Sequence, residues 1–257
     1  MKPAAAGLAA GFLMAACAGV TPPPDDAVMR GYLPPDSLDA MVAGAGTWRD
    51  GGDLVASQAL RAQEDADRWW MATAHAELRP PEAAQHFDCA LGTRLAASPR
   101  PALTRIMNRL LVDSAALGAR LAALHPRPRP IAADPSRRAC QRMTETDRSS
   151  GSWPATGAVA GAAYGELFAA LAPDRAAAVR AMGRELGVSR AVCAMNWPSD
   201  VEDGLRLGRA VYARAMESPS FQPELAAARA EVEAARSEGR VSPACAAERR
   251  ALRPAGG

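Results

Sequence analysis

Apolar residues recur at intervals of three and four along most of this chain, and this helical period constrains its fold more than any other feature. No segment alternates apolar and polar residues in a way that predicts a strand. At 257 residues the chain is long enough to bury a sizeable core, so we expect an all-α protein, a compact single-domain helical bundle. The pattern predicts helices over residues 53–76, 80–91, 100–123, 156–171, 173–186, 199–217 and 221–238.

One long segment, residues 125–154, interrupts the helical period with prolines, arginines and a run rich in serine, glycine and threonine. We expect an irregular loop between two helices. Long ordered loops inside compact domains are often functional. This loop is therefore a candidate part of the functional site.

The chain begins with the pattern of an export signal, in which Lys2 precedes an apolar stretch too short to span a bilayer. Two modes of processing remain open. Ala16-Cys17-Ala18 resembles an ordinary cleavage site and would release a soluble product. Leu13-Met14-Ala15-Ala16-Cys17 resembles a lipobox and would make Cys17 a lipidated N-terminus. In both cases we expect the protein in the periplasm or exported, with a lipid anchor at the cell envelope as its only link to a membrane.

These features divide the chain into four parts. Residues 1–18 form the signal peptide (1–16 for a lipoprotein signal), and residues 19–35 form a Pro-rich lead. The helical domain is expected over 36–250, followed by a tail at 251–257.

Export places the remaining cysteines in an oxidising compartment, where disulfides persist. Without Cys17 the chain has four, which allow three pairings. We predict the sequential pairing, Cys89–Cys140 and Cys193–Cys245; the alternative is four buried free thiols. The cysteines lack the spacing of a metal site, so neither a metal nor a cofactor is expected.

The charge balance excludes one class of partner. The formal net charge is +2, and no basic cluster is interleaved with aromatic residues. Nucleic-acid binding is therefore not expected. The sequence indicates no oligomeric state.

Three short motifs in the second half carry the strongest functional signal. They are Arg129-Pro130, then Pro154-Ala155-Thr156-Gly157, and finally Ser189-Arg190-x5-Asn196-x3-Asp200. With further blocks at 32–36, 86–92 and 171–175, they resemble the bacterial class A non-specific acid phosphatases over about residues 31–250. That family lies within the phosphatidic acid phosphatase type 2 and vanadium haloperoxidase superfamily. Its pattern is K-x6-R-P, P-S-G-H and S-R-x5-H-x3-D.

The resemblance implies an all-α fold and a phosphoryl-transfer site. In the family, the histidine of the third motif attacks phosphorus and the following aspartate orients its imidazole. The histidine of the second motif protonates the leaving group. The lysine, two arginines and backbone amides at a helix start hold the phosphoryl oxygens.

This chain departs from the pattern at the residues that perform the chemistry. Ala122 stands at the lysine position, Gly157 at the acid histidine and Asn196 at the nucleophile, while Asp200 is retained. A misalignment cannot hide the histidines, because the last of the three in the chain is His125. None of the catalytic histidines is therefore intact.

We therefore expect an exported, catalytically impaired acid-phosphatase homologue that retains binding of phosphate or a phosphomonoester. The residues expected to bind the anion are Arg129, Thr156, Ser189 and Arg190. Alternatively, both arginines pair with Asp200 or other carboxylates in a relict pocket. An active periplasmic acid phosphatase and a structural or interaction lipoprotein of the envelope also remain open. Trp153 is expected at the pocket mouth.

Overall fold

Helices account for all the regular secondary structure in the described residues, 29–134 and 136–253, of the computed structural model. The α-helices are α1 (Pro35–Ala45), α2 (Asp53–Ala59), α3 (Asp67–Ala74), α4 (Asp88–Leu91), α5 (Pro101–Leu124), α6 (Pro130–Ala133), α7 (Glu145–Ser149), α8 (Thr156–Leu171), α9 (Ala176–Val192), α10 (Pro198–Ala215), α11 (Phe221–Ser237) and α12 (Cys245–Ala251). Short 3-10 helices are η1 (Leu60–Gln63), η2 (Glu82–Phe87), η3 (Leu95–Ala97) and η4 (Pro173–Arg175). The all-α prediction is confirmed. The export signal, Cys17 and most of the Pro-rich lead lie outside the described residues.

Four of the five long helices agree with the sequence pattern, but α9, predicted over 173–186, instead spans Ala176–Val192. The shorter helices do not agree. Helices α5, α8, α10 and α11 begin and end within two residues of their predicted bounds. The helix predicted over 53–76 is instead divided into α2, η1 and α3. Asp65 lies in this break with φ of +64°, a left-handed conformation that an α-helix cannot continue through. The predicted loop at 125–154 contains two short helices, α6 and α7.

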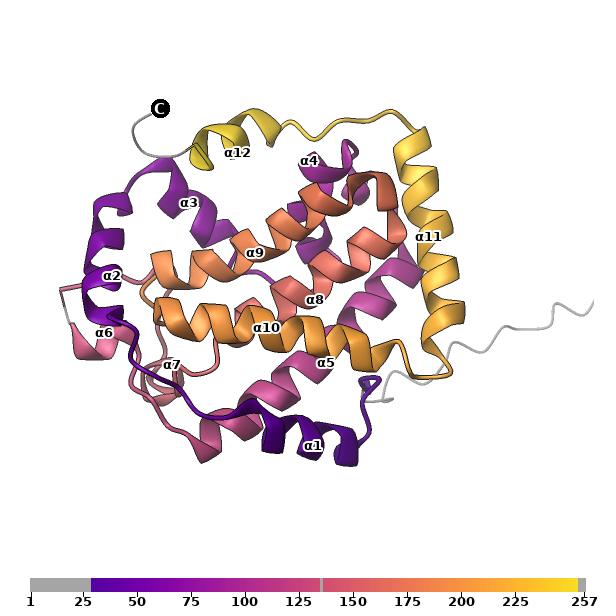
Figure 1. The fold of residues 1–257 in the computed structure, drawn as a ribbon. Helices are drawn as coiled ribbons and strands as arrows, with labels where there is room; N and C mark the ends of the chain where they lie inside the picture. Colours follow the sequence, from indigo (N-terminus) through magenta and orange to yellow (C-terminus); the bar gives the residue numbers. More distant parts are fainter. Residues whose placement is uncertain (1–28, 135, 254–257) are drawn as a thin grey trace, which may run out of the picture.

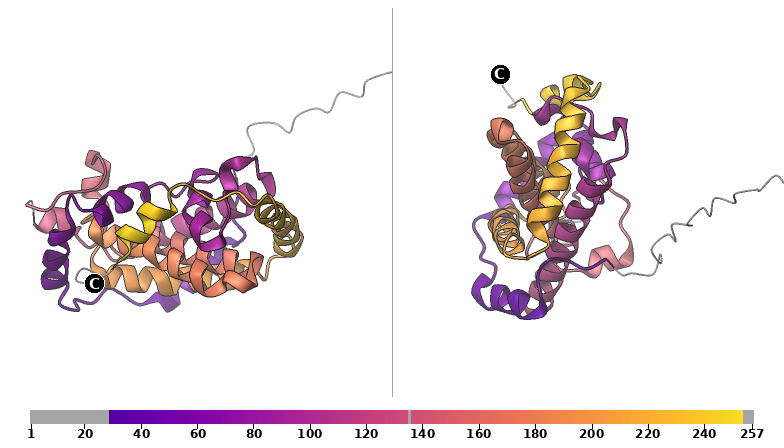
Figure 2. Two further views of the ribbon diagram at one scale, coloured as in Figure 1. Left: turned by 90° about the horizontal axis from the view of Figure 1, so that it is seen from above. Right: turned by 90° about the vertical axis from the view of Figure 1, so that its right-hand side faces the viewer.

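Helix α8 lies at the centre of the molecule and packs against α5, α9 and α10 (Figure 1). Thirteen of its sixteen residues are buried, which explains why its sequence is almost entirely apolar and rich in alanine and glycine. Helix α11 crosses the end of this group and is seen nearly end-on from above (Figure 2). In the described part of the chain, no helix combines the length and apolar character needed to cross a bilayer.

The connections around α8 bring four helix ends to one side of the molecule. Helices α5 and α9 end there, and α8 and α10 begin there, on the left in Figure 1. The N–H of Ala155, just before α8, donates to the carbonyl of Asp200 in the first turn of α10 (3.1 Å). Because the three motifs occupy these ends, the fold gathers them.

Two disulfides connect segments that are distant in the sequence, and they correct our prediction. Cys89 pairs with Cys245, and Cys140 pairs with Cys193. The sequential pairing is therefore wrong. The sequential pairing fails because α5 lies between Cys89 and Cys140. Its 24 residues, at 1.5 Å each, carry the chain about 36 Å from one end of this helix to the other. Cys140 therefore lies beside the end of α9, where Cys193 follows.

Asp113 of α5 binds the N-terminal segment to the bundle. Its carboxylate accepts the backbone N–H groups of Tyr32 (2.8 Å) and Leu33 (3.1 Å). The side chain is buried, and despite these two bonds burial raises the pKa of Asp113 to about 6. The native protein should therefore hold a proton here that the unfolded chain releases at a lower pH.

We expect Asp113→Asn to change how stability depends on pH. Between pH 4 and 6 the native state binds more protons at Asp113 than the unfolded state, so this group lowers the free energy of unfolding as pH rises. The asparagine variant loses that dependence. The stability of the wild type relative to the variant should fall by about 2 kcal/mol across this interval. Urea unfolding at pH 4, 5, 6 and 7 measures it, and parallel pH profiles would contradict the expectation.

Candidate functional site

Six of the predicted site residues come together where the four helix ends meet. We call Ala122, Arg129, Thr156, Gly157, Arg190 and Asn196 the motif cluster. Thr156 is the first residue of α8, and its side chain packs against α5, where a Cβ added to Gly118 would lie 2.4 Å from Thr156 Oγ1. Ala122 lies one helical turn after Gly118 and faces Gly151 of the loop. Residues that were selected from separate sequence motifs are therefore neighbours in the fold.

Arg190 is the central side chain of the cluster. Its Nε donates to Asn196 Oδ1 (3.4 Å) and its Nη1 to Gln141 Oε1 (3.5 Å), both long bonds to neutral oxygens. Among the described residues no carboxylate forms a salt bridge with it. Burial, together with the positive charge of Arg129, lowers the pKa of Arg190 to about 10. This guanidinium still carries its charge at neutral pH, without an anionic partner.

Arg190 also occupies the space beside Gly157. A Cβ added at Gly157 would lie 2.7 Å from Arg190 Cδ. Any larger residue at this position, including the histidine of the family pattern, would therefore require Arg190 to move. The glycine and the present position of the arginine depend on each other.

Arg129 is held by the surrounding backbone. Its three nitrogens donate to the carbonyl of Asp147 (3.0 Å), the carbonyl of Met195 (2.6 Å) and Ser150 Oγ (2.9 Å). Burial lowers its pKa, against the opposing charges of Asp147 and Asp200. Arg129 thus connects the end of α7 to the turn between α9 and α10, and adds positive charge near Arg190.

Asn196 is fixed by two contacts. Its amide nitrogen donates to the carbonyl of Ser152, and its Oδ1 accepts from Arg190. The side chain is 3% exposed. The preceding turn includes Ala194 with φ of +54°, and Cys193 of the buried disulfide to Cys140 anchors it. The amide of Asn196 is therefore buried and held on both sides by hydrogen bonds.

Ser189 is directed away from the motif cluster, although the sequence placed it among the anion-binding residues. Its Oγ lies 2.9 Å from a guanidinium nitrogen of Arg68 and 2.8 Å from His75 Nδ1. It is 1% exposed. Sequence reasoning missed the contact with His75, because 114 residues separate the two and no local spacing indicates it.

Asp200 pairs with neither of the two motif arginines. Its carboxylate accepts from Arg127, from Ser152 Oγ (2.5 Å) and from the N–H of Trp197 (3.2 Å). Arg127 also donates to Asp53 (2.8 Å). In the relict-pocket alternative both arginines pair with Asp200 or other carboxylates, but among the described residues neither Arg129 nor Arg190 forms a salt bridge. The sequence offered one sign of the actual partner of Asp200, a further arginine two residues before Arg129, which is Arg127.

His125 and Trp153 lie beside the motif cluster. The rings of His125 and Trp153 meet edge to face with centroids 5.5 Å apart. Trp153 is fully buried and its indole N–H donates to Asp203 (2.8 Å). The expectation that Trp153 lines a pocket mouth is therefore wrong, because this side chain belongs to the core.

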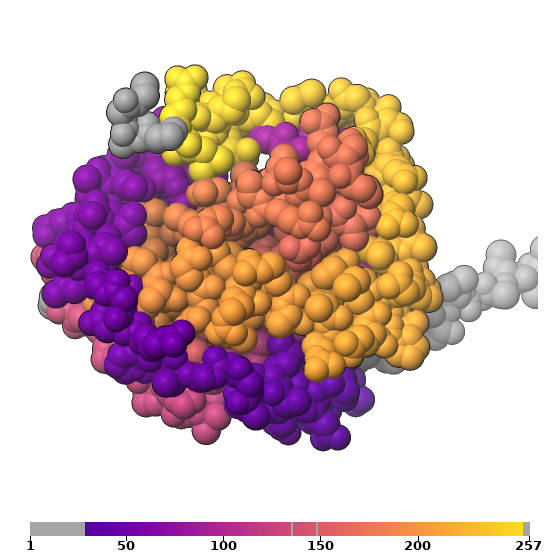
Figure 3. Space-filling model, viewed as in Figure 1, coloured from indigo at the N-terminus to yellow at the C-terminus, as the bar shows by residue number. Residues whose placement is uncertain are grey.

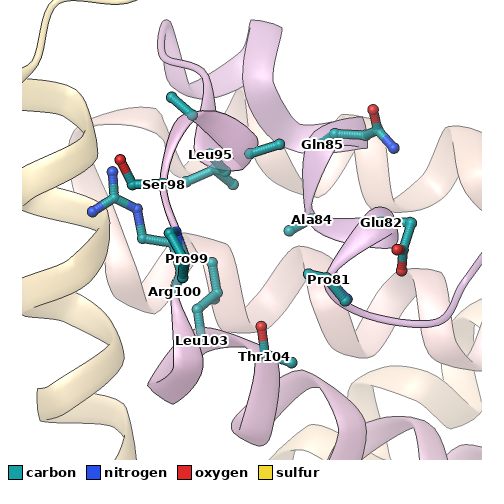
Figure 4. Close-up of a pocket in the computed structure, with 12 residues that line it drawn as sticks. Pro81, Glu82, Ala84, Gln85, Leu95, Ser98, Pro99, Arg100, Leu103 and Thr104 are labelled. Carbon is teal, nitrogen blue, oxygen red and sulfur yellow. The ribbon is translucent and has the colours of Figure 1, made fainter.

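A hollow of about 400 Å³ lies elsewhere, between η2, η3 and the start of α5 (Figure 4). Its walls are mainly apolar and include Ala84, Leu95 and Leu103. Arg100 turns its guanidinium away from the hollow toward α11, where it pairs with Glu238 (2.5 Å). None of the motif residues lines this hollow.

Comparison with known proteins identifies relatives of one kind. An acid phosphatase from Zymomonas mobilis is 30% identical over 181 residues, which cover 69% of this chain and 67% of that protein. A non-specific acid phosphatase from Salmonella typhimurium is 27% identical over 173 residues, covering 66% and 69%. One from Providencia stuartii is 24% identical over 172 residues, covering 66% and 69%. No protein-family model matches the chain.

Proposed function

The chain belongs to the acid phosphatase family, and we propose that it is an exported member that binds phosphate or a phosphomonoester but has largely lost the hydrolytic reaction. The observation that carries the binding proposal is the charge of Arg190. This partly buried guanidinium lies next to Arg129, and within the part of the chain that the structure describes its side-chain bonds go to neutral oxygens of Asn196 and Gln141. A buried cation without a partner is costly, so an anion that pairs with it gains affinity.

The start of α8 supports an anion at the same place. The N–H groups of Thr156 and Gly157 make no hydrogen bond within the described residues, and they belong to the first turn of a sixteen-residue helix. Such groups carry the positive end of the helix dipole and bind phosphate oxygens. Gly157 contacts Arg190, so these amides and the guanidinium can face one anion.

The proposed loss of hydrolysis rests on what replaces the imidazoles. An amide nitrogen has no lone pair available to attack phosphorus, and that of Asn196 is already donated to Ser152. His75 and His86 lie against each other, with ring centroids 5.0 Å apart, and His75 is bonded to the side of Ser189 away from the cluster. Loss of a nucleophile of this kind lowers the rate on the order of 10⁶-fold.

Export is the part of the proposal that concerns the N-terminus. Residues 1–18 have the pattern of a signal peptide. The disulfides Cys89–Cys245 and Cys140–Cys193 support an oxidising compartment, where such bonds persist. Mass spectrometry of the mature N-terminus distinguishes a soluble periplasmic protein from one lipidated at Cys17.

We expect inorganic phosphate or vanadate to raise the melting temperature, and Arg190→Ala to abolish the rise. At a ligand concentration ten times Kd, binding adds about 1.4 kcal/mol, or about 3–5 °C for a domain of this size. Arg184→Ala is the matched control, because Arg184 lies on the same helix but pairs with Glu202 on the surface (2.8 Å). Differential scanning fluorimetry in chloride and in phosphate at equal ionic strength measures the shift.

Turnover of an aryl phosphate is the decisive companion measurement. At pH 5 to 6 we expect no turnover above that of a heat-inactivated sample. Hydrolysis that is lost in Arg190→Ala and kept in Arg184→Ala would show an active phosphatase and overturn the proposed impairment. Equal melting temperatures with and without phosphate would instead overturn the binding role and favour a structural protein.

A further inference from the structure

A second hollow, of about 490 Å³, lies under the C-terminal helix and outside the motif cluster. In the space-filling view α12, drawn in yellow, lies along the upper edge of the molecule (Figure 3). The hollow is formed by residues of α3, η2 and α12 and by the segments next to these helices. Its volume is within the range of small-molecule sites. The residues that line it are Asp67, Trp70, Met71, Ala74, His75, Glu77, Gln85, His86, Ser242, Ala244, Ala247, Glu248 and Ala251.

The disulfide between Cys89 and Cys245 holds this hollow together. Cys245 is the first residue of α12, and Glu248 follows it by one helical turn. Asp88 precedes Cys89 and is buried. The covalent bond therefore keeps two carboxylates near each other, so that burial and the negative charge of Asp88 raise the pKa of Glu248, with Arg249 opposing them.

Glu248 differs from the other carboxylates of the hollow because no cation among the described residues forms a salt bridge with it. Asp67 accepts from Arg250 (3.3 Å), and Glu77 is paired with Arg79 (2.6 Å). Glu248 forms neither a salt bridge nor a side-chain hydrogen bond with any residue that the structure describes. A half-buried carboxylate in a hollow gains most from a cation that enters it.

A buried imidazole contributes a second unpaired polar atom. His86 is 9% exposed, and its Nε2 donates to the carbonyl of Glu77 (2.8 Å). Because that carbonyl can only accept, Nε2 carries the proton and the neutral ring keeps a lone pair on Nδ1. Within the described residues Nδ1 has no hydrogen-bond partner. It can accept an N–H from a ligand in the hollow.

An exposed aromatic side chain completes the wall. Trp70 is 57% exposed although tryptophan is normally well covered, and its neighbour Trp69 is buried. The two rings meet edge to face, with centroids 4.9 Å apart. A tryptophan beside unpaired negative charge is the common arrangement for holding an organic cation, because the ring face attracts it.

We propose that this hollow binds a small organic cation, an amine in its ammonium form attached to an aromatic or apolar group. The ammonium pairs with Glu248 and donates to His86 Nδ1, while the apolar part lies along Trp70 and the alanines of α12. Nothing in this proposal depends on phosphate binding at Arg190, and the two can fail separately.

Phenethylammonium is a suitable probe, with neutral 2-phenylethanol as its matched control. By isothermal titration calorimetry we expect saturable, one-to-one binding of the ammonium that weakens with rising salt. Glu248→Gln should weaken it at least tenfold, and Trp70→Ala at least threefold. Glu202→Gln, which removes an exposed carboxylate on α10, should leave it unchanged.

For a site with a Kd of about 1 mM, phenethylammonium should bind well below about 20 mM. The proposal is overturned if no binding is seen up to that concentration, if the neutral alcohol binds equally well, or if Glu248→Gln leaves binding unchanged. Glu248→Gln keeps the shape of the side chain at a partly exposed position, and a melting curve verifies that it folds. Trp70→Ala tests the ring face independently, because loss of an exposed side chain leaves the core intact.

Discussion

Gly208→Ala is expected to lower the free energy of unfolding by about 3 kcal/mol. Gly208 lies on α10 where this helix crosses α8, and a Cβ there would be 2.2 Å from the carbonyl oxygen of Val159 and 2.8 Å from Ala162 Cβ. The first of these atoms belongs to the backbone of the most buried helix, so it cannot rotate away. The two helices must separate, and packing along α8 is lost. Urea unfolding at neutral pH measures the change.

Gly44→Ala is the matched control. Gly44 also lies in a helix, in the last turn of α1, but no atom is within 4 Å of a Cβ added there. Because alanine has the higher helix propensity, this substitution should raise stability by about 0.5–1 kcal/mol. Opposite signs for one chemical change would show that helix approach, and not glycine as such, determines the result. A loss of less than 1 kcal/mol in Gly208→Ala would contradict the packing argument.

The same close packing positions the motif cluster. Gly204, one turn before Gly208, faces the carbonyl of Ala155, immediately before Thr156 and Gly157. Helix α9 approaches α8 through Gly183 in the same way, since a Cβ there would lie 2.5 Å from the carbonyl oxygen of Gly161. A wider spacing of these helices would move the amides of α8 away from Arg190. Gly208→Ala should therefore weaken the proposed phosphate binding as well as the fold.

The sequence predicted the long helices, which depend on residues near one another in the chain. It did not predict the disulfides and side-chain contacts that join residues far apart in the chain. The apolar period predicts α5, α8, α10 and α11 because each buries a continuous face. It failed at Asp65, whose left-handed backbone ends a helix without a change in apolar spacing. The pairs Cys89–Cys245 and His75–Ser189 join elements across the bundle, so spacing along the chain holds no trace of them.

The candidate site divides in the same way. The motifs predicted that Arg129, Gly157, Arg190 and Asn196 lie together, since the family pattern records a shared geometry. They did not predict that Asp200 is bound by Arg127, because the resemblance implies a histidine as the partner of this aspartate. In the structure Asp200 instead belongs to a buried ionic network with Arg127 and Asp53.

Removing the arginine of this ionic network should have a large effect on stability. Arg127→Met is expected to lower the free energy of unfolding at pH 7 by about 3–5 kcal/mol, because it leaves Asp53 and Asp200 buried without a cation. Their side chains are 4% and 0% exposed, and that of Arg127 is 6% exposed. Arg184→Met, which removes a guanidinium from an exposed pair with Glu202, should cost less than about 1 kcal/mol. Urea unfolding of both variants measures the difference.

The dependence on pH separates lost charge pairing from lost packing. In the wild type, burial would raise the pKa of Asp53, but hydrogen bonds from Ser199 and Arg127 outweigh it and hold the pKa below its usual value. That stability is present above pH 4 and is lost as pH falls through the native pKa. Burial already raises the pKa of Asp200 in the wild type, against hydrogen bonds from Ser152 and the charge of Arg127. Without Arg127 we expect burial to raise the pKa of Asp53 as well and that of Asp200 further. The native variant then binds more protons than its unfolded chain, and its stability rises as pH falls from 7 toward 4.

The deficit of Arg127→Met should therefore shrink on acidification, and Arg127→Met with Asp200→Asn should recover part of it at pH 7. A deficit that stays constant from pH 7 to 4 would mean that the side chain acts by packing against Trp48 and Trp197, whose rings it also contacts.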